Sequence, residues 1–167
     1  LEPAIFLLPV FTQEVLRRGP DVGGYLMAVN GMGGMFMILV ISSFGFIFPK
    51  GKLLLWSAVF SSIAILLFSY AYIMFLAFFF IFAFAWGQSC FRATNITLLQ
   101  SLCVPEMRGR ITSLQTYSFA FVMVASIVFG WFAGITTVSI ALATIGIIGL
   151  ILSILANMFQ DRIKQLA

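Results

Sequence analysis

The feature that most constrains this chain is a succession of long apolar stretches, separated by short joints that hold nearly all of the charge. Hydrophobic residues make up 62% of the sequence and charged residues 8%, against about 25% charged residues in soluble domains. Several stretches reach the length of about 20 residues that a helix needs to cross a bilayer. Because a backbone in lipid must satisfy its own hydrogen bonds, such stretches fold as helices. The sequence therefore predicts an all-α membrane protein.

We expect a single transmembrane domain over residues 1–167, with one truncated and five complete spans joined by short loops. The first stretch is too short to span a bilayer alone. We interpret it as the far end of a helix that begins before Leu1. The predicted helices cover residues 3–16, 22–47, 53–69, 73–103, 111–133 and 138–159.

The joint within residues 98–117, LLQSLCVPEMRGRITSLQTY, is the most informative break. Pro105 cannot continue the preceding helix, and Glu106 places a negative charge at the positive end of the next one. Arg108 and Arg110 hold this end of the span at the cytoplasmic face, while Gly109 lets a neighbouring backbone approach closely. The joint therefore fixes an orientation.

The basic residues of alternate joints predict the same orientation. One side carries only Arg17 and Arg18, whereas the other side carries most of the basic residues of the chain. Because cytoplasmic loops are enriched in Lys and Arg, we expect the richer side and the C-terminus to be cytoplasmic. The residues on the richer side are Lys50, Lys52, Arg108, Arg110, Arg162 and Lys164.

The composition excludes several classes of function. There is no histidine, so Ser/His and Cys/His catalysis and histidine-ligated haem or metal are excluded, and we expect neither an enzyme nor a cofactor. The spacing of Cys90 and Cys103 suits neither a compact disulfide nor a zinc site. The basic residues form no long run or face of the kind that binds nucleic acid.

Arg92 is the strongest anomaly, because it lies well inside the predicted helix 73–103. An arginine near the bilayer centre costs about 2.5–3.5 kcal/mol on insertion scales, so it should face protein or water and have a partner. At about 100° per residue, Arg92 shares one face with other polar side chains and with two aromatic residues at its margin. The members of this face are Gln88, Arg92, Asn95 and Leu99, with Phe84 and Phe91.

Two interpretations of this face remain open. In the first, it lines a transport cavity, where Arg92 attracts an anionic or strongly hydrogen-bonding substrate and Phe84 and Phe91 supply apolar contact. In the second, Arg92 is a structural cation, bonded to backbone carbonyls or to a carboxylate in a portion that precedes Leu1. No acidic residue of the sequence falls at an obvious mid-membrane position.

Small and polar residues mark further helix contacts. Asn30 either contributes to the same cavity or forms an interhelical hydrogen bond. The glycines of three predicted helices are expected to allow close helix packing, since lipid offers no hydrophobic drive for association. These glycines are Gly31, Gly33, Gly34, Gly130, Gly134, Gly146 and Gly149.

The stretch TNITLLQSLCVPEMRGRITSL, residues 94–114, resembles the joint between helices ten and eleven of major facilitator superfamily transporters. The closest likeness within that superfamily is to the bacterial group of enterobactin exporters and macrolide efflux proteins, which implies a multi-pass protein of the bacterial inner (plasma) membrane. LPVFTQEVL, residues 8–16, resembles the end of helix seven. FPKGKLLL, residues 48–55, occupies the place of the basic loop between helices eight and nine, but it lacks the aspartate of the superfamily's loop motif.

The resemblance implies that the chain is the C-terminal six-helix half of the fold, with an N-terminal half preceding it and a substrate site between the halves near the midplane. It implies that the first, second, fourth and fifth helices line the cavity and that the other two stand outside. Carried over to this sequence, the cavity candidates are Arg92 and Asn95. The elements at the cytoplasmic gate are Glu106, Arg108, Gly109 and Arg110, with Lys50 and Lys52 in the basic loop.

The expected function is secondary active transport, with efflux of a small organic molecule by alternating access of the two halves. The expected partners are the lipid bilayer, the substrate and the N-terminal half. The alternative is a membrane scaffold or truncated gene product that acts through helix contacts alone. An intramembrane enzyme is poorly supported, because the sequence offers no nucleophile with a nearby base.

Overall fold

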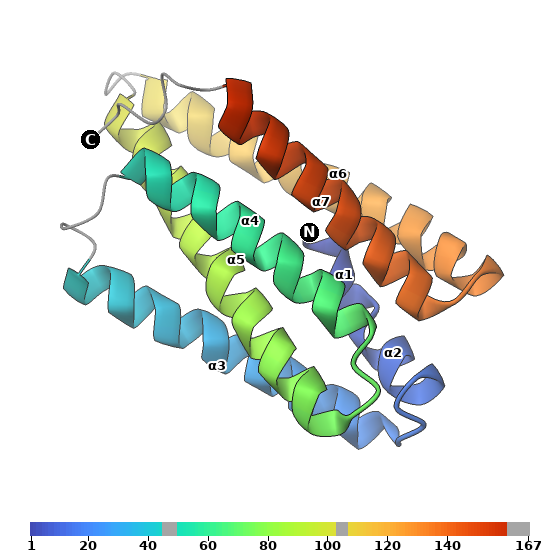
Figure 1. The fold of residues 1–167 in the computed structure, drawn as a ribbon. Coiled ribbons are helices and arrows are strands. Elements are labelled where there is room, and N and C mark those ends of the chain that lie inside the picture. The colour runs from blue at the N-terminus through green and yellow to red at the C-terminus, as the bar shows by residue number, and fades with distance from the viewer. Residues whose placement is uncertain (45–49, 103–106, 160–167) are drawn as a thin grey trace.

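The computed structural model describes residues 1–44, 50–102 and 107–159, and within the helices it leaves out the side chains of Pro20, Phe44, Leu102, Arg108, Ile111 and Phe159. The described residues form helices and turns, without a strand. Two short helices lead into five long ones (Figure 1). The helices are α1 (Pro3–Phe6), α2 (Leu8–Glu14), α3 (Pro20–Phe44), α4 (Lys50–Ser69), α5 (Met74–Leu102), α6 (Arg108–Ile135) and α7 (Val138–Phe159).

The five long helices are long and apolar enough to cross a membrane, by length and composition. This confirms the prediction of an all-α chain with several membrane spans. The predicted boundaries of α7 are those observed, and the turn predicted at residues 70–72 separates α4 from α5. Helix α6 extends beyond its predicted range at both ends. The predicted ends at residues 47 and 103 lie outside the described residues.

The predicted continuous helix over residues 3–16 is wrong. It is divided at Leu7 into α1 and α2. Pro9 explains the break, because it lacks the N–H that would bond to the carbonyl of Ile5, and its ring clashes with that carbonyl in a continuous helix. The amide of Leu7 instead closes a tighter turn on the carbonyl of Ala4, at 3.1 Å.

The predicted loop at residues 50–52 is also helical. Lys50, Gly51 and Lys52 form the first turn of α4, and Gly51 is buried. The start of α3 also differs from the prediction. This helix begins two residues earlier than predicted, with Pro20 at its first position. A proline is favourable there because the first helical amides have no partner within the helix.

The long helices alternate in direction (Figure 1). The ends of α3, α5 and α7 gather with the starts of α4 and α6 at one end of the bundle, and the remaining connections lie at the other end. Alternate joints therefore share a side, as the charge argument assumed. Leu1 lies at mid-height, where its side chain meets Gly149 of α7.

Glycines allow the closest helix contacts of the bundle. A side chain on Gly87 of α5 would meet Ser61 of α4 at 3.1 Å, and one on Gly146 of α7 would meet Leu66 of α4 at the same distance. Gly33 of α3 faces the carbonyl of Phe82 in α5, which its added carbon would approach to 2.7 Å. The packing role is thus confirmed for Gly33 and Gly146.

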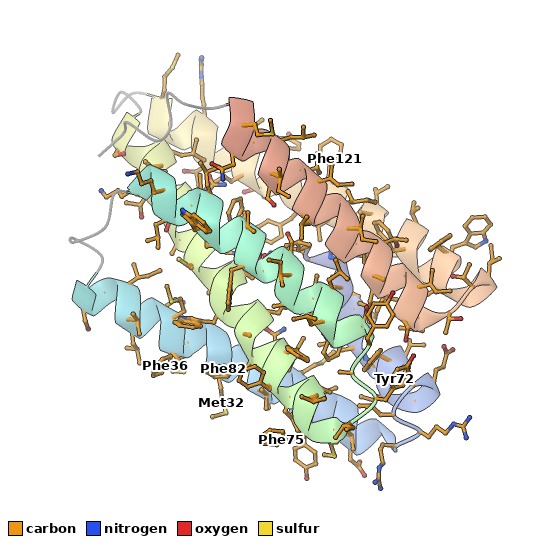
Figure 2. All side chains as sticks on the ribbon, viewed as in Figure 1. Met32, Phe36, Tyr72, Phe75, Phe82 and Phe121 are labelled. Atoms are coloured by element: carbon orange, nitrogen blue, oxygen red, sulfur yellow. The ribbon has the colours of Figure 1, made fainter. Side chains whose placement is uncertain are left out.

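The hydrophobic core forms where α2, α4, α5 and α7 meet, and the rings of Phe11 and Phe68 lie 4.5 Å apart in it. Figure 2 shows Phe36 and Phe82 beside each other where α3 packs on α5, with a ring separation of 6.4 Å.

The prediction of close packing is wrong for Gly31, Gly130 and Gly134, because open space surrounds each of them.

Candidate functional site

A groove of about 380 Å³ runs between α1, α3 and α5, and five polar side chains line it. The start of α1 closes it at the level of Arg92, because the chain enters the bundle at mid-height. The wall from α5 is polar over the turn from Gln88 to Arg92, whereas the wall from α3 is glycine and apolar residues apart from Asn30. The residues that line it are Glu2, Ile5, Asn30, Gly31, Gly34, Met35, Ile38, Ala85, Gln88, Ser89 and Arg92.

Glu2 and Arg92 form an ion pair at the centre of the groove. Nη2 of Arg92 donates to Oε1 of Glu2, and Nε2 of Gln88 donates to the same oxygen at 3.2 Å. The Arg92 side chain is 51% exposed and that of Glu2 is 23% exposed. The pair therefore borders open space, where a ligand or water can reach it.

The aromatic ring of Phe119 in α6 covers one side of the arginine. The guanidinium carbon of Arg92 lies 5.9 Å from the centre of this ring, which is a cation–π distance. Arg92 therefore connects three elements, α1, α5 and α6. This contact brings α6 to the groove, although α6 is exposed over most of its surface.

The ion pair corrects one expectation from the sequence. We expected no obvious mid-membrane acid in this chain, and one of the open interpretations paired Arg92 with backbone carbonyls or with a carboxylate before Leu1, but Glu2 supplies the carboxylate. The signal in the sequence was an acidic residue directly before an apolar stretch. It was misleading because Glu2 lies at the start of the chain, while the fold places that start at the middle of the bundle.

The structure brings together three of the predicted cavity residues. Asn30, Gln88 and Arg92 all line the groove. Their grouping requires α3 to lie close to α5, and the small residues at this crossing allow it, since a side chain on Gly34 would meet Ser89 Oγ at 2.7 Å. Ser89 is a further polar residue of the groove that the sequence analysis did not single out.

The other three predicted cavity residues lie elsewhere. Phe84 is fully buried in the hydrophobic core. Phe91 lines a separate pocket of about 340 Å³ with Ser61, Ser62 and other residues of α4 and α7. Asn95 is half-buried and is not part of the groove wall. A single helical arc predicted one face, but the neighbouring helices divide that face among a groove, a pocket and the core.

The predicted gate residues lie at the end of the bundle where α4 and α6 begin. Lys50 and Lys52 belong to the first turn of α4, while Arg108, Gly109 and Arg110 open α6, and Lys52, Gly109 and Arg110 are exposed. Glu106 lies outside the described residues. Within the described part, no ion pair is formed by the basic side chains of this end.

At the opposite end, a cleft of about 680 Å³ forms where three connections meet. Glu14 and Arg17 line it together with Tyr70, Tyr72 and residues at the start of α7. Arg17 has a positive backbone angle, φ 49°, which is uncommon for a residue other than glycine. The tyrosines at this end fit the aromatic belt of a membrane interface.

Cys90 is buried in α5 and lies beside the hydroxyls of Ser57 and Thr94.

Across the described ranges, no group of three or more His, Cys, Asp or Glu side chains could hold a metal ion. The polar groups that line the groove are one cation, one carboxylate, the amides of Asn30 and Gln88 and the hydroxyl of Ser89, so its chemistry is ionic and hydrogen-bonding.

No protein-family model, curated protein or solved structure matches this chain.

Proposed function

We propose that this chain is part of a secondary active transporter and that the groove around Glu2 and Arg92 is half of its substrate site. The observation that carries the proposal is the ion pair at mid-height among apolar helices. Charged residues in this position are costly and characteristically line substrate or ion pathways. Half of the Arg92 side chain is exposed, and this open side supports a binding role in addition to the structural one of joining α1 to α5.

The resemblance at residues 94–114 supports a more detailed proposal, the C-terminal half of the major facilitator fold. Substrate sites of such transporters lie between two repeats near the bilayer midplane. In this chain, α3 and α6 are the least buried of the long helices, with 22% and 6% of their most apolar windows buried. On the proposal, these helices contact the other half, and the groove faces it.

On this proposal the transporter exports a small organic molecule by alternating access. Arg92 attracts an anionic or strongly hydrogen-bonding group, while Gln88 and Asn30 orient it. Bound between the two halves, the substrate passes from one side to the other as the halves rock about the site.

The first test is the native polypeptide itself. Intact mass of the protein from its own membrane, or the reading frame upstream of Leu1, should reveal six further apolar spans. A native polypeptide without them contradicts the two-half proposal and favours the scaffold.

The second test separates transport from folding. Arg92→Ala in the native polypeptide should reduce efflux of an anionic fluorescein dye from cells far more than it reduces the amount of protein in the membrane. Arg18→Ala is the matched control, because Arg18 is exposed and lies outside the groove. Equal losses of efflux and abundance in Arg92→Ala would show that Arg92 is structural.

Orientation is tested by cysteine labelling. Lys52→Cys is exposed at the proposed cytoplasmic end and Arg18→Cys at the opposite end. Impermeant reagents should reach the first only from the cytoplasm and the second only from outside. The reverse pattern overturns the proposed topology.

A further inference from the structure

The cleft at the end of the bundle that carries Arg17 combines a charged rim with an apolar floor. Its volume is about 680 Å³. The floor lies along α7, where Ile140, Ala143 and Ile147 share one face because they are three and four residues apart. At 1.5 Å per residue, this stripe extends for about 10 Å from the first turn of α7 toward the middle of the span. The cleft is therefore polar at the end of the bundle and apolar along the helix.

The rim carries one charge of each sign, the carboxylate of Glu14 and the guanidinium of Arg17. Both side chains are exposed, and within the described residues neither forms an ion pair. Glu14 is the last residue of α2, where the carbonyl end of a helix disfavours an anion. Each charge is thus open to a partner of opposite sign, and a ligand that carries both an anion and a cation complements the two together.

The backbone at Arg17 has a conformation that suits glycine better than arginine. Its φ of 49° lies in the left-handed region. The amide of Arg18 bonds to the carbonyl of Thr12 at 3.0 Å, and this bond closes the turn around Arg17. Substitution of Arg17 by glycine would therefore keep the turn and remove only the side chain.

Two tyrosines complete the rim from the connection between α4 and α5. Tyr70 and Tyr72 are 60% and 69% exposed, and Figure 2 shows Tyr72 beside that connection. Tyrosine side chains concentrate where lipid headgroups meet acyl chains, because the ring is apolar and the hydroxyl forms hydrogen bonds. The rim thus lies at the level of headgroups and the floor at the level of acyl chains. This order matches a lipid, which is polar at one end and apolar at the other.

We propose that the cleft binds one phospholipid with a phosphoethanolamine headgroup. The ammonium group of the lipid donates to the carboxylate of Glu14, Arg17 donates to its phosphate, and an acyl chain lies along the floor on α7. The match is specific, because phosphatidylcholine has a cation without an N–H donor and phosphatidylglycerol has no cation. The inference goes beyond the proposed function, since it requires neither transport nor a particular orientation.

The test is native mass spectrometry of the native polypeptide in detergent, titrated separately with the dioleoyl form of each of the three lipids. The unmodified protein should bind one phosphatidylethanolamine about tenfold more tightly than either other lipid, because each of those lacks one charge-assisted hydrogen bond. Arg17→Gly should weaken the binding of phosphatidylethanolamine about tenfold, because the donor to the phosphate is lost. Glu14→Gln should bind phosphatidylethanolamine and phosphatidylcholine equally, because the anionic acceptor for the ammonium group is absent.

Two exposed charges at the same end of the bundle serve as matched controls. Arg18 and Asp21 lie outside the cleft, so Arg18→Ala and Asp21→Asn should leave all three affinities unchanged. The Tm of Arg17→Gly without added lipid should be no lower than that of the unmodified protein, because the turn suits glycine. Loss of lipid binding in this variant then reports on the side chain and not on folding.

The source of the headgroup is tested by competition. Free phosphoethanolamine in excess should not displace the lipid, because it has no acyl chain to bury on the apolar floor. Displacement by the free compound overturns the inference in favour of a water-soluble ligand.

Equal affinity of the unmodified protein for the three lipids, or unchanged binding by Arg17→Gly, also overturns the inference. The absence of any bound lipid overturns it in favour of a protein segment that covers the cleft. Lipid binding is measured without flux and at residues outside the groove. A negative result therefore leaves the transport proposal intact, and a loss of transport leaves the lipid site intact.

Discussion

Helices α4 and α6 are alike in apolarity and both can cross a membrane, yet they have opposite surroundings. In the most apolar stretch of α4, 44% of the residues are buried, against 6% in that of α6. Helix α4 lies between α5 and α7, whereas α6 lies behind α7 (Figure 1). Hydrophobicity therefore does not decide which helix becomes the centre of this protein.

The hydrogen bonds of three serines in the two helices do not explain the difference either. The hydroxyls of Ser61 and Ser62 in α4 donate to the carbonyl of Ala58, and that of Ser126 in α6 donates to the carbonyl of Val122. Each is satisfied within its own helix. These serines give no helix a partner through hydrogen bonds.

The size of the facing residues distinguishes the two helices. Gly87 of α5 and Gly146 of α7 both contact α4. By contrast, Gly130 and Gly134 of α6 face open space. Lipid is as apolar as a leucine side chain, so helices associate where small residues let many atoms touch. The comparison shows that small residues promote packing only where a neighbour meets them.

The largest effect is expected from filling the contact between α4 and α5. Gly87→Leu should lower the free energy of unfolding by about 1–3 kcal/mol, because the new side chain meets Phe60 and Ser61. Gly130→Leu on α6 should change it by less than about 0.5 kcal/mol, since nothing lies near. The measurement is unfolding by SDS in mixed micelles. Similar losses for both variants would contradict the contrast between the helices.

A somewhat smaller effect is expected on α3, whose burial is intermediate. Gly33→Ala places a carbon against the carbonyl of Phe82, which cannot rotate away, and should cost about 1–2 kcal/mol. Gly31→Ala is its control on the same helix and should stabilise by up to about 1 kcal/mol through helix propensity. The same unfolding assay applies. A loss in Gly31→Ala would indicate that α3 has a neighbour at this position.

The next effect concerns the aromatic contact of α6 with the groove. Phe119→Leu removes the ring beside Arg92 and should cost about 0.5–1 kcal/mol. A double-mutant cycle with Arg92→Gln isolates the contact, because Phe119→Leu should cost almost nothing once the guanidinium is absent. A cost that persists in the Arg92→Gln background would assign the effect to apolar packing of α6.

The last prediction involves no change in stability. The chain contains three tryptophans, of which Trp131 on α6 is 70% exposed and Trp86 on α5 packs edge-on against Phe60. In variants of residues 1–167 alone, without the other half that the proposal places against α6, brominated lipids should quench the fluorescence of Trp131 more strongly than that of Trp86, each measured as the one remaining tryptophan. Trp56, which is exposed on α4, is the control. Weaker quenching of Trp131 would show that another protein surface covers α6.

The sequence by itself determined that the chain is helical and suited to a membrane. Its apolar stretches are long enough to span a bilayer, and a single stretch in lipid satisfies its own backbone hydrogen bonds only as a helix. It also located the turn at Tyr70 and Tyr72. It singled out Arg92, because a charged residue inside an apolar helix is recognisable whichever face of the helix it lies on. These are local properties of one stretch of chain.

Only the tertiary structure decided the partner of Arg92 and the fate of the predicted polar face. Glu2 is distant in sequence and reaches Arg92 because α1 enters the bundle at mid-height. Phe84 shares an arc with Gln88 but lies in the core, since the crossing of neighbouring helices assigns each part of a face to a different environment. In lipid, hydrophobicity does not distinguish a buried face from an exposed one, so that choice depends on which helices meet.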